Sequence, residues 1–226
     1  DLEILTSAYL TQTFRDWGRA NSYGGKSINT ILADNVTNLD AYRIMTGQAN
    51  GEVIFRGASR NYTNKGVQSL LSYTFRRAAF TNKMELGIRL HSDQANRYGT
   101  QSKFQMSDGL LILTEQGEQG NQENQIREAF SFASFANFSF NYKKAELHLG
   151  LRRESIILDF YNFGTTDFAR TGKNLSSASN KIIVWLPGAS LTYTLNPNNT
   201  FFLGLHKGFS PPGMPNTSSN TQAISE

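Results

Sequence analysis

The feature that most constrains this sequence is the alternation of apolar and polar side chains with a period of two residues. Residues 84–93 read MELGIRLHSD, in which positions 84, 86, 88 and 90 are apolar and the positions between them are Glu, Gly, Arg and His. Residues 145–155 (AELHLGLRRES) repeat the pattern. Such alternation predicts β-strands with one apolar and one polar face. A polar face that mixes charge with glycine suits a water-filled lumen.

Seven stretches follow this pattern or are rich in β-forming residues, although the facing of the first is ambiguous. We expect antiparallel strands, each paired with its sequence neighbour, at residues 2–17, 60–76, 83–97, 126–142, 145–160, 181–195 and 200–209. The side chains expected to face lipid are Met84, Leu86, Phe138, Leu147, Leu149 and Leu191. Those expected to face the lumen are Glu85, Arg89, His148, Arg152 and Thr192. A register slip of one residue would invert every assignment.

The connections between these strands alternate between short and long. The short ones are residues 76–82, 142–144 and 196–200, and the long ones are 18–60, 94–125, 161–181 and 208–226. Short turns at one end and long loops at the other are typical of outer-membrane barrels. Four loops this long are uncommon in a compact soluble domain. Partial helical spacing within residues 27–48 predicts a short helix.

Composition supports a barrel wall. The mean hydropathy is −0.42 and no run of 18 apolar residues occurs, which excludes a transmembrane helix but leaves a transmembrane barrel open. Aromatic residues make up 12% of the chain. Several stand beside the predicted short turns, as in the aromatic girdles of barrels, although aromatic residues also favour strands in general.

Several kinds of chemistry find no support in the sequence. Cysteine is absent, which excludes disulfides and Cys-based metal sites. The net charge of +4 is spread along the chain, so we expect no nucleic-acid partner. The three histidines, His91, His148 and His206, fall on different predicted strands at differing depths and predict no metal site. No catalytic arrangement is evident, so we expect neither an enzyme nor a bound cofactor.

Glycine recurs at one place in three hairpins. The segments ELGIR (85–89), HLGLR (148–152) and FLGLH (202–206) each begin a predicted strand after a short turn, and their glycines fall on the lumen face. A missing side chain there allows another element, such as an internal plug, to approach the wall.

Taken in order along the chain, these stretches resemble the TonB-dependent outer-membrane receptors, and among them the ferric-citrate transporter branch. The resemblance is carried by YLTQTFRDW (9–17), AYRIMTG (41–47), RNYTNKGVQ (60–68), MELGIRLHSDQANR (84–97), HLGLRRES (148–155) and WLPGASLTYTLNPNNTFFLGLHKGFSPPG (185–213). The ferric-citrate assignment rests mainly on residues 41–97. The resemblance implies that residues 1–226 are part of one transmembrane β-barrel domain of 22 strands, of which about seven are present.

The resemblance also implies partners and a location. The family has an N-terminal plug domain with a TonB box, which this chain lacks, and seven strands cannot close a barrel without leaving backbone groups unpaired in lipid. The absence of a signal peptide fits a mature or truncated chain. We therefore expect a fragment of a transporter in the bacterial outer membrane, which binds a ferric chelate, contacts lipid and lipopolysaccharide, and engages TonB through its plug.

Arginines provide the candidate ligand contacts. Arg15, Arg56, Arg60, Arg89 and Arg97 fall at or near the predicted loop ends of strands. Ferric chelates with carboxylate ligands are anionic, and guanidinium groups attract and bind carboxylates in a bidentate manner. Of the five, Arg56, Arg60 and Arg97 lie in the stretches that match best. Contact with lipopolysaccharide and ion pairs within the wall are the alternative roles.

Other functions remain compatible with the strand pattern. A passive porin or an adhesin barrel would lack the plug. A barrel enzyme would need a carboxylate–His or Ser–His cluster at one rim, and none is evident. A soluble carbohydrate-binding sandwich fits the long loops least well.

Overall fold

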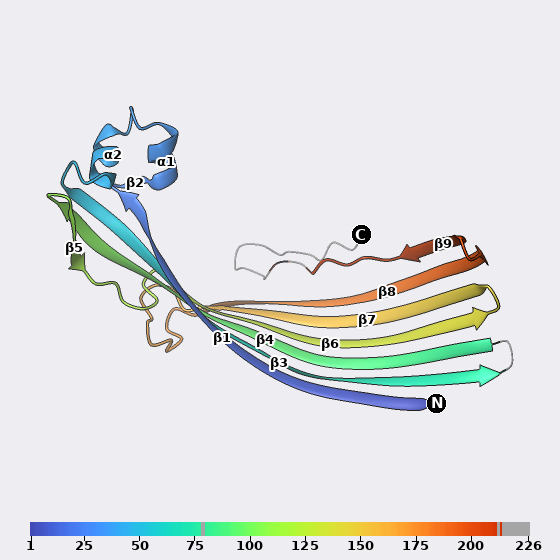
Figure 1. The fold of residues 1–226 in the computed structure, drawn as a ribbon. Coiled ribbons are helices and arrows are strands. Elements are labelled where there is room, and N and C mark those ends of the chain that lie inside the picture. The colour runs from blue at the N-terminus through green and yellow to red at the C-terminus, as the bar shows by residue number, and fades with distance from the viewer. Residues whose placement is uncertain (78–79, 212, 214–226) are drawn as a thin grey trace.

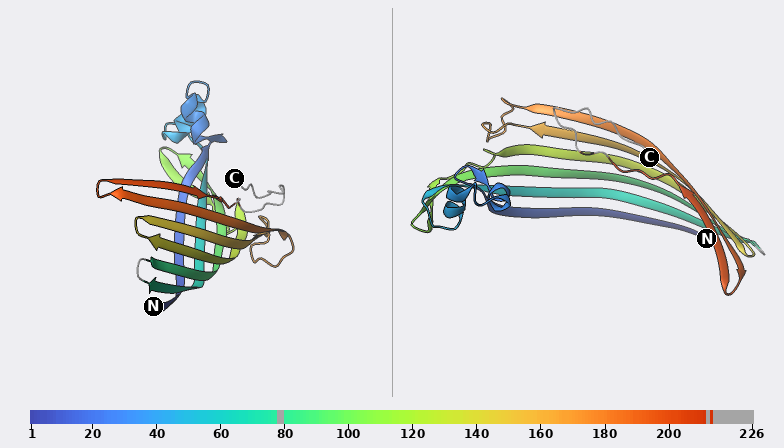
Figure 2. Two further views of the ribbon diagram at one scale, coloured as in Figure 1. Left: turned by 90° about the vertical axis from the view of Figure 1, so that its right-hand side faces the viewer. Right: turned by 90° about the horizontal axis from the view of Figure 1, so that it is seen from above.

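A computed structural model describes residues 1–77, 80–211 and 213 of the chain. It consists of one twisted antiparallel sheet that curves along its length, with two short helices at one end (Figures 1 and 2). The strands are β1 (Leu2–Tyr23), β2 (Lys26–Ser27), β3 (Gly51–Arg77), β4 (Phe80–Ser107), β5 (Leu110–Glu115), β6 (Glu123–Tyr142), β7 (Ala145–Asn162), β8 (Ser176–Asn196) and β9 (Asn199–His206). The helices are α1 (Ile28–Ala33) and α2 (Leu39–Met45).

The seven predicted strands and their pairing are confirmed. The order across the sheet is β2-β1-β3-β4-β6-β7-β8-β9, with β5 paired to the end of β4, and every ladder among the described residues is antiparallel. The predicted short connections between β6 and β7 and between β8 and β9 are hairpin turns, and the one between β3 and β4 contains residues 78–79, which lie outside the described residues. The two described turns and the paired ends of β3 and β4 lie at one end of the sheet (Figure 1). The predicted long segment 208–226 falls mostly outside the described residues.

The register confirms which predicted side chains share a face. Residues opposite each other in a ladder point to the same side of a sheet. Met84 lies opposite Phe138, which lies opposite Leu149, and these residues lie on what we call the apolar face. Glu85 lies opposite Asn137 and Gly150, on the polar face. The alternation is incomplete, because buried apolar side chains also occur on the polar face at Leu158, Phe160, Ile182 and Val184.

The apolar face carries an exposed hydrophobic band. It includes Phe80, Leu86, Ile88 and Leu90 on β4, Phe138, Phe140 and Tyr142 on β6, and Leu147, Leu149 and Leu151 on β7. From Phe80 to Leu90 a strand rises about 34 Å, or about 26 Å along the membrane normal at a tilt of about 40°, which matches the height of about 25 Å typical of barrels.

An aromatic row borders this band beside the short turns. Phe80 stacks on Tyr142 with ring centroids 4.7 Å apart. Tyr193 and Phe201 lie in the same row farther across the sheet, because each is joined to it through consecutive register pairs. The placement supports the girdle interpretation, since rings at one level on an apolar face are what a membrane interface favours.

Two of the predicted long loops are wrong in extent. Strands β1, β3 and β4 continue well past the apolar band, so most of segments 51–60 and 98–107 is strand, and β5 forms a further hairpin. β4 alone has 28 residues. The prediction failed because residues 56–60 (RGASR) and 98–103 (YGTQSK) contain few large apolar side chains to mark an alternation, and backbone pairing to the neighbouring strands is enough to maintain them.

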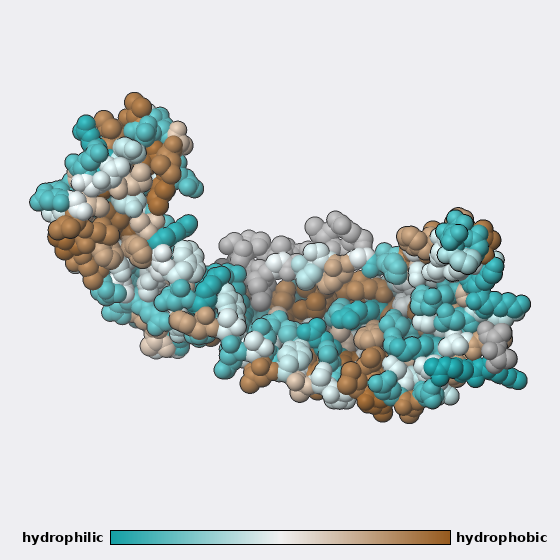
Figure 3. All heavy atoms as spheres, viewed as in Figure 1, coloured by the Kyte–Doolittle hydropathy of each residue, from teal (hydrophilic) through white to brown (hydrophobic). Residues whose placement is uncertain are grey.

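These longer strands form an extension that carries the helices (Figure 1). The single short helix predicted within residues 27–48 is two helices, and Ile44 of α2 packs with Val53 and Met106 in a small buried core. Hydrophobic spheres cluster at this end of the molecule in Figure 3, and the exposed residues Leu110, Leu111, Ile112 and Leu113 belong to β5. Among the described residues, no helix is long and apolar enough to cross a membrane.

The connection between β7 and β8 is tied back to the sheet. Arg170 donates hydrogen bonds to the side chains of Asn124 (2.6 Å) and Asn96 (2.5 Å) and lies 3.9 Å from the ring centroid of Tyr98. Asp167 accepts hydrogen bonds from the backbone N–H groups of Thr171 and Gly172. This segment, residues 163–175, is therefore an ordered loop.

Candidate ligand-binding site

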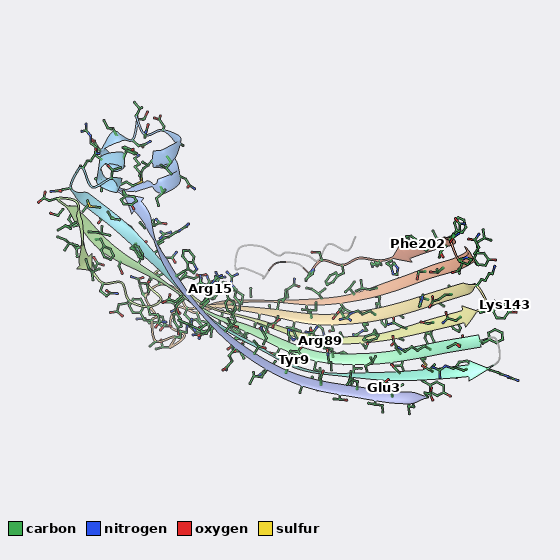
Figure 4. The ribbon with its side chains drawn as sticks, in the orientation of Figure 1. Glu3, Tyr9, Arg15, Arg89, Lys143 and Phe202 are labelled. Atoms are coloured by element: carbon green, nitrogen blue, oxygen red, sulfur yellow. The ribbon has the colours of Figure 1, made fainter. Side chains whose placement is uncertain are left out.

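Three of the five candidate arginines lie side by side on the polar face. Arg15 of β1 is opposite Arg60 of β3, and Arg60 is opposite Arg97 of β4. All five candidates lie within strands, not at loop ends, because these strands run farther than the sequence indicated. Figure 4 places Arg15 where the broad part of the sheet narrows into the extension. Like charges opposite each other on a sheet are unfavourable, so the row needs a counter-charge or an anionic ligand.

Glu123 at the start of β6 supplies part of that counter-charge. One carboxylate oxygen pairs with the guanidinium of Arg60 and the other lies 3.0 Å from that of Arg97. Arg60 is only 6% exposed and also donates to the backbone carbonyls of Ser59 and Tyr98. Arg60 is therefore fully engaged within the wall.

Arg97 is less completely satisfied. Burial lowers its pKa from the ordinary value, the nearby cations Arg127 and Arg15 lower it further, and Glu123 acts in the opposite direction. Its Nε is buried and has no hydrogen-bond partner in the described part of the chain. An additional negative charge at this position would therefore be favourable.

Arg127 of β6 completes the cluster, one row farther from the extension. Its guanidinium donates a hydrogen bond to the side-chain oxygen of Gln125 at 3.0 Å and lies 5.5 Å from the ring centroid of Phe160. The arginine cluster, which we define as Arg15, Arg60, Arg97 and Arg127, holds four guanidinium groups against the one carboxylate of Glu123, a net formal charge of +3. Arg15 is exposed and makes no hydrogen bond or ion pair among the described residues.

The other two candidates lie apart from the cluster. Arg56 is on the extension side of it, opposite Arg19, and donates to the side chain of Gln101 at 3.1 Å. Arg89 lies on the other side, within the span of the apolar band, and donates to the hydroxyl of Tyr9 at 2.9 Å. Tyr9 and Arg89 meet in the middle of the broad sheet in Figure 4.

Sequence reasoning missed Glu123 and Arg127. The strand was expected to begin at residue 126, so Glu123 fell in a loop. Their spacing of four residues, which places both on one face of a strand, was the available signal. No group of three or more metal-binding side chains occurs in the described ranges.

The chain is similar to known outer-membrane receptors. The family described as TonB dependent receptor-like, beta-barrel, matches residues 4–225. A comparison with curated proteins gives no match. The siderophore receptor PiuA from Acinetobacter baumannii superimposes with a TM-score of 0.64 at 12% identity, over 98% of this chain and 32% of that one. The ferric citrate transporter FecA in its unliganded form gives a TM-score of 0.48 at 13% identity, over 66% of this chain and 23% of that one.

At these identities the solved structures show the fold alone, and the chain spans less than a third of their length. The matched family consists of receptors and not enzymes, as the sequence indicated. The family belongs to the bacterial outer membrane. The family match over nearly the whole chain, together with the open antiparallel sheet, shows that this chain belongs to the TonB-dependent receptors as part of their β-barrel.

Proposed function

We propose that this chain forms part of the wall of a TonB-dependent transporter that takes up an anionic ferric chelate, and that the arginine cluster is where the chelate first binds. The observation that carries the proposal is the register row Arg15–Arg60–Arg97 with a single shared carboxylate. A net positive charge on the lumen side is what an anionic ligand would be attracted to.

The height of the cluster suits capture from outside the cell. The short turns mark the periplasmic end of a barrel, so the extension points outward. Arg97 lies seven residues beyond Leu90, about 24 Å along the strand and about 18 Å above the apolar band at a tilt of about 40°. The cluster is thus in the vestibule above the membrane.

The arginines of the cluster have different roles. Arg60 has its hydrogen bonds filled by the wall, so it positions Glu123 and its neighbours. Arg15 and Arg97 retain capacity to bind a carboxylate, since Arg15 is exposed and Arg97 has an unpaired Nε, whereas Arg127, which donates to Gln125, adds positive charge. A guanidinium offers two parallel donors to a carboxylate, which favours a polycarboxylate chelate over a neutral one.

Ferric citrate is the first candidate among such chelates. The choice rests on the resemblance of residues 41–97 to the ferric-citrate branch and on the anionic character that the cluster requires. Another carboxylate siderophore would satisfy the same chemistry. Membership in the TonB-dependent receptors favours this function over a passive porin or an adhesin barrel.

Transport would depend on parts of the receptor beyond this chain. A plug domain engaged by TonB would release the bound chelate inward, with no covalent step. Outer-membrane lipid and lipopolysaccharide would surround the apolar face.

The test is uptake of radiolabelled ferric citrate by cells that express the full-length receptor as their only route for it. We expect uptake that requires both the receptor and TonB. Uptake that persists without TonB would favour a passive channel. Uptake of a different ferric chelate alone would remove the ferric-citrate assignment and leave the transporter class intact.

A further inference from the structure

One arginine lies on the face where the wall otherwise meets lipid. Arg153 of β7 has the same parity as Leu147, Leu149 and Leu151, which are exposed on the apolar face. Its register partners are Ser134 on β6 and Trp185 on β8. A cation at such a position is costly in hydrocarbon, and so points to a function or a partner.

The height of Arg153 places it just inside the outer boundary of the band. It lies eight residues beyond Ala145 in the girdle row, about 27 Å along the strand and about 21 Å along the membrane normal at a tilt of about 40°. That leaves its Cα about 4 Å below the top of a band about 25 Å high, within the distance that a snorkelling arginine side chain can reach.

A second cation lies just above the same boundary. Lys181 of β8 is exposed and lies opposite Ile157, four residues beyond Trp185 and on the same face. Counted from Tyr193 in the girdle row, it lies about 31 Å up the membrane normal, or about 6 Å above the band. The hydroxyl-bearing Ser155 lies in the row between Arg153 and Lys181.

Neither cation has a carboxylate partner within the described ranges. The guanidinium of Arg153 lies 5.9 Å from the ring centroid of Trp185, which is 52% exposed. Such a cation–π contact orients the guanidinium without neutralising it. Glu128 and Asp159 lie opposite each other one row beyond Lys181, so these two carboxylates mark the outer edge of the site.

We propose that Arg153, Trp185 and Lys181 form a binding site for the phosphorylated headgroup of a lipopolysaccharide molecule in the outer leaflet. A phosphate at the boundary would lie between the guanidinium below it and the ammonium above it. The acyl chains would pack along the exposed apolar side chains nearer the short turns, such as Leu149 and Leu151. Two cations at the level of a headgroup, above a continuous apolar surface, match an amphiphile with an anionic head.

The experiment measures binding of lipid A to the delipidated full-length receptor by native mass spectrometry, in the presence of Mg²⁺. We expect the parent to bind bis-phosphorylated lipid A, and the double variant Arg153→Gln with Lys181→Gln to bind it at least about tenfold more weakly. Trp185→Phe should give an intermediate loss. The matched control is Lys143→Ala, at a periplasmic turn of the same sheet, which should bind like the parent.

Further binding measurements distinguish phosphorylated lipid A from other ligands of the site. Dephosphorylated lipid A should bind the parent as weakly as bis-phosphorylated lipid A binds the double variant, and phosphatidylglycerol should not compete. Folding of each variant is checked by gel electrophoresis. A variant that is folded keeps the slow migration of the unheated barrel. Equal binding by the parent and the double variant would overturn the proposal, as would equal binding of phosphatidylglycerol. Loss of receptor self-association in the double variant, with lipid binding unchanged, would instead identify a contact between two copies.

Discussion

The hydroxyl of Tyr9 lies 2.5 Å from Nδ1 of His91, although the two residues are on strands that do not pair with each other. β3 lies between them, and the residue at that point of β3 is Gly66, which is in register with both. The tyrosine ring therefore crosses β3 at a glycine, where no side chain blocks it. Arg89 and Asp93 extend the contact into a chain of hydrogen bonds along the polar face.

Removing the Tyr9 hydroxyl should weaken this connection between β1 and β4. Tyr9→Phe deletes the acceptor of Arg89 and the partner of His91, and we expect it to cost about 1–2 kcal/mol in the free energy of unfolding. The measurement is urea unfolding of the full-length barrel. Tyr73→Phe, whose ring is exposed on the apolar face, is the control and should change little. Equal effects of the two variants would show that the hydrogen bonds do not matter.

A side chain added at Gly66 should destabilise the barrel more than one added at a glycine that has open space around it. A Cβ there would lie 2.6 Å from the carbonyl oxygen of Leu90 and 2.5 Å from Cζ of Tyr9, so both β4 and the ring would have to move. We expect Gly66→Ala to destabilise the barrel by about 1–3 kcal/mol. Gly208→Ala, with no atom within 4 Å of the added Cβ, serves as the control in the same unfolding assay. A neutral Gly66→Ala would contradict the packing described here.

The sequence predicted the strands of the membrane band well and those beyond it poorly. Period two is clear where an exposed apolar face lies opposite a polar face, as in residues 84–91 and 145–152. It is weak in residues 98–103 (YGTQSK), which contain no aliphatic side chain and where pairing with β3 maintains β4. Three of the candidate arginines proved to be neighbours, but this depended on the register of β1, β3 and β4, which the ambiguous facing of residues 2–17 did not supply.

The two faces can be tested directly. Spin labels at Leu149 and His148 should differ in their access to a lipid-soluble relaxing agent, because these residues are consecutive on β7 and point to opposite sides. Label at Leu149 should respond strongly and label at His148 weakly in membranes that contain the full-length receptor. The opposite order, or equal access, would refute the assignment of lipid to the apolar face.

Order in loop 163–175 should depend on pH at the acidic end. Hydrogen bonds from the backbone N–H and side chain of Thr171, and from the N–H of Gly172, lower the pKa of Asp167 below its ordinary value of 3.8. The folded state therefore favours the ionised carboxylate. The resulting stabilisation is present above the ordinary pKa and is lost as the pH falls through the lower folded value.

Amide hydrogen exchange at Thr171 and Gly172 measures this effect. We expect protection at neutral pH that decreases in strong acid beyond the intrinsic pH dependence of exchange. In Asp167→Asn the protection should be weaker at neutral pH and show no such acid transition. Asp108→Asn, in the turn between β4 and β5, is the control and should leave the loop unchanged. An acid transition that persists in Asp167→Asn would assign it to another group.

The central claim is that lumen arginines above the membrane bind an anionic ferric chelate, and the affinity of the full-length receptor for ferric citrate tests it most directly. A bidentate Arg–carboxylate contact is worth roughly 1.5–3 kcal/mol, so Arg97→Ala should weaken binding about tenfold to a hundredfold. Arg97→Lys should restore only part of it, because an ammonium lacks the fork geometry. Lys143→Ala should bind like the parent. Parent-like affinity in alanine variants of Arg15, Arg97 and Arg127 alike would contradict the account.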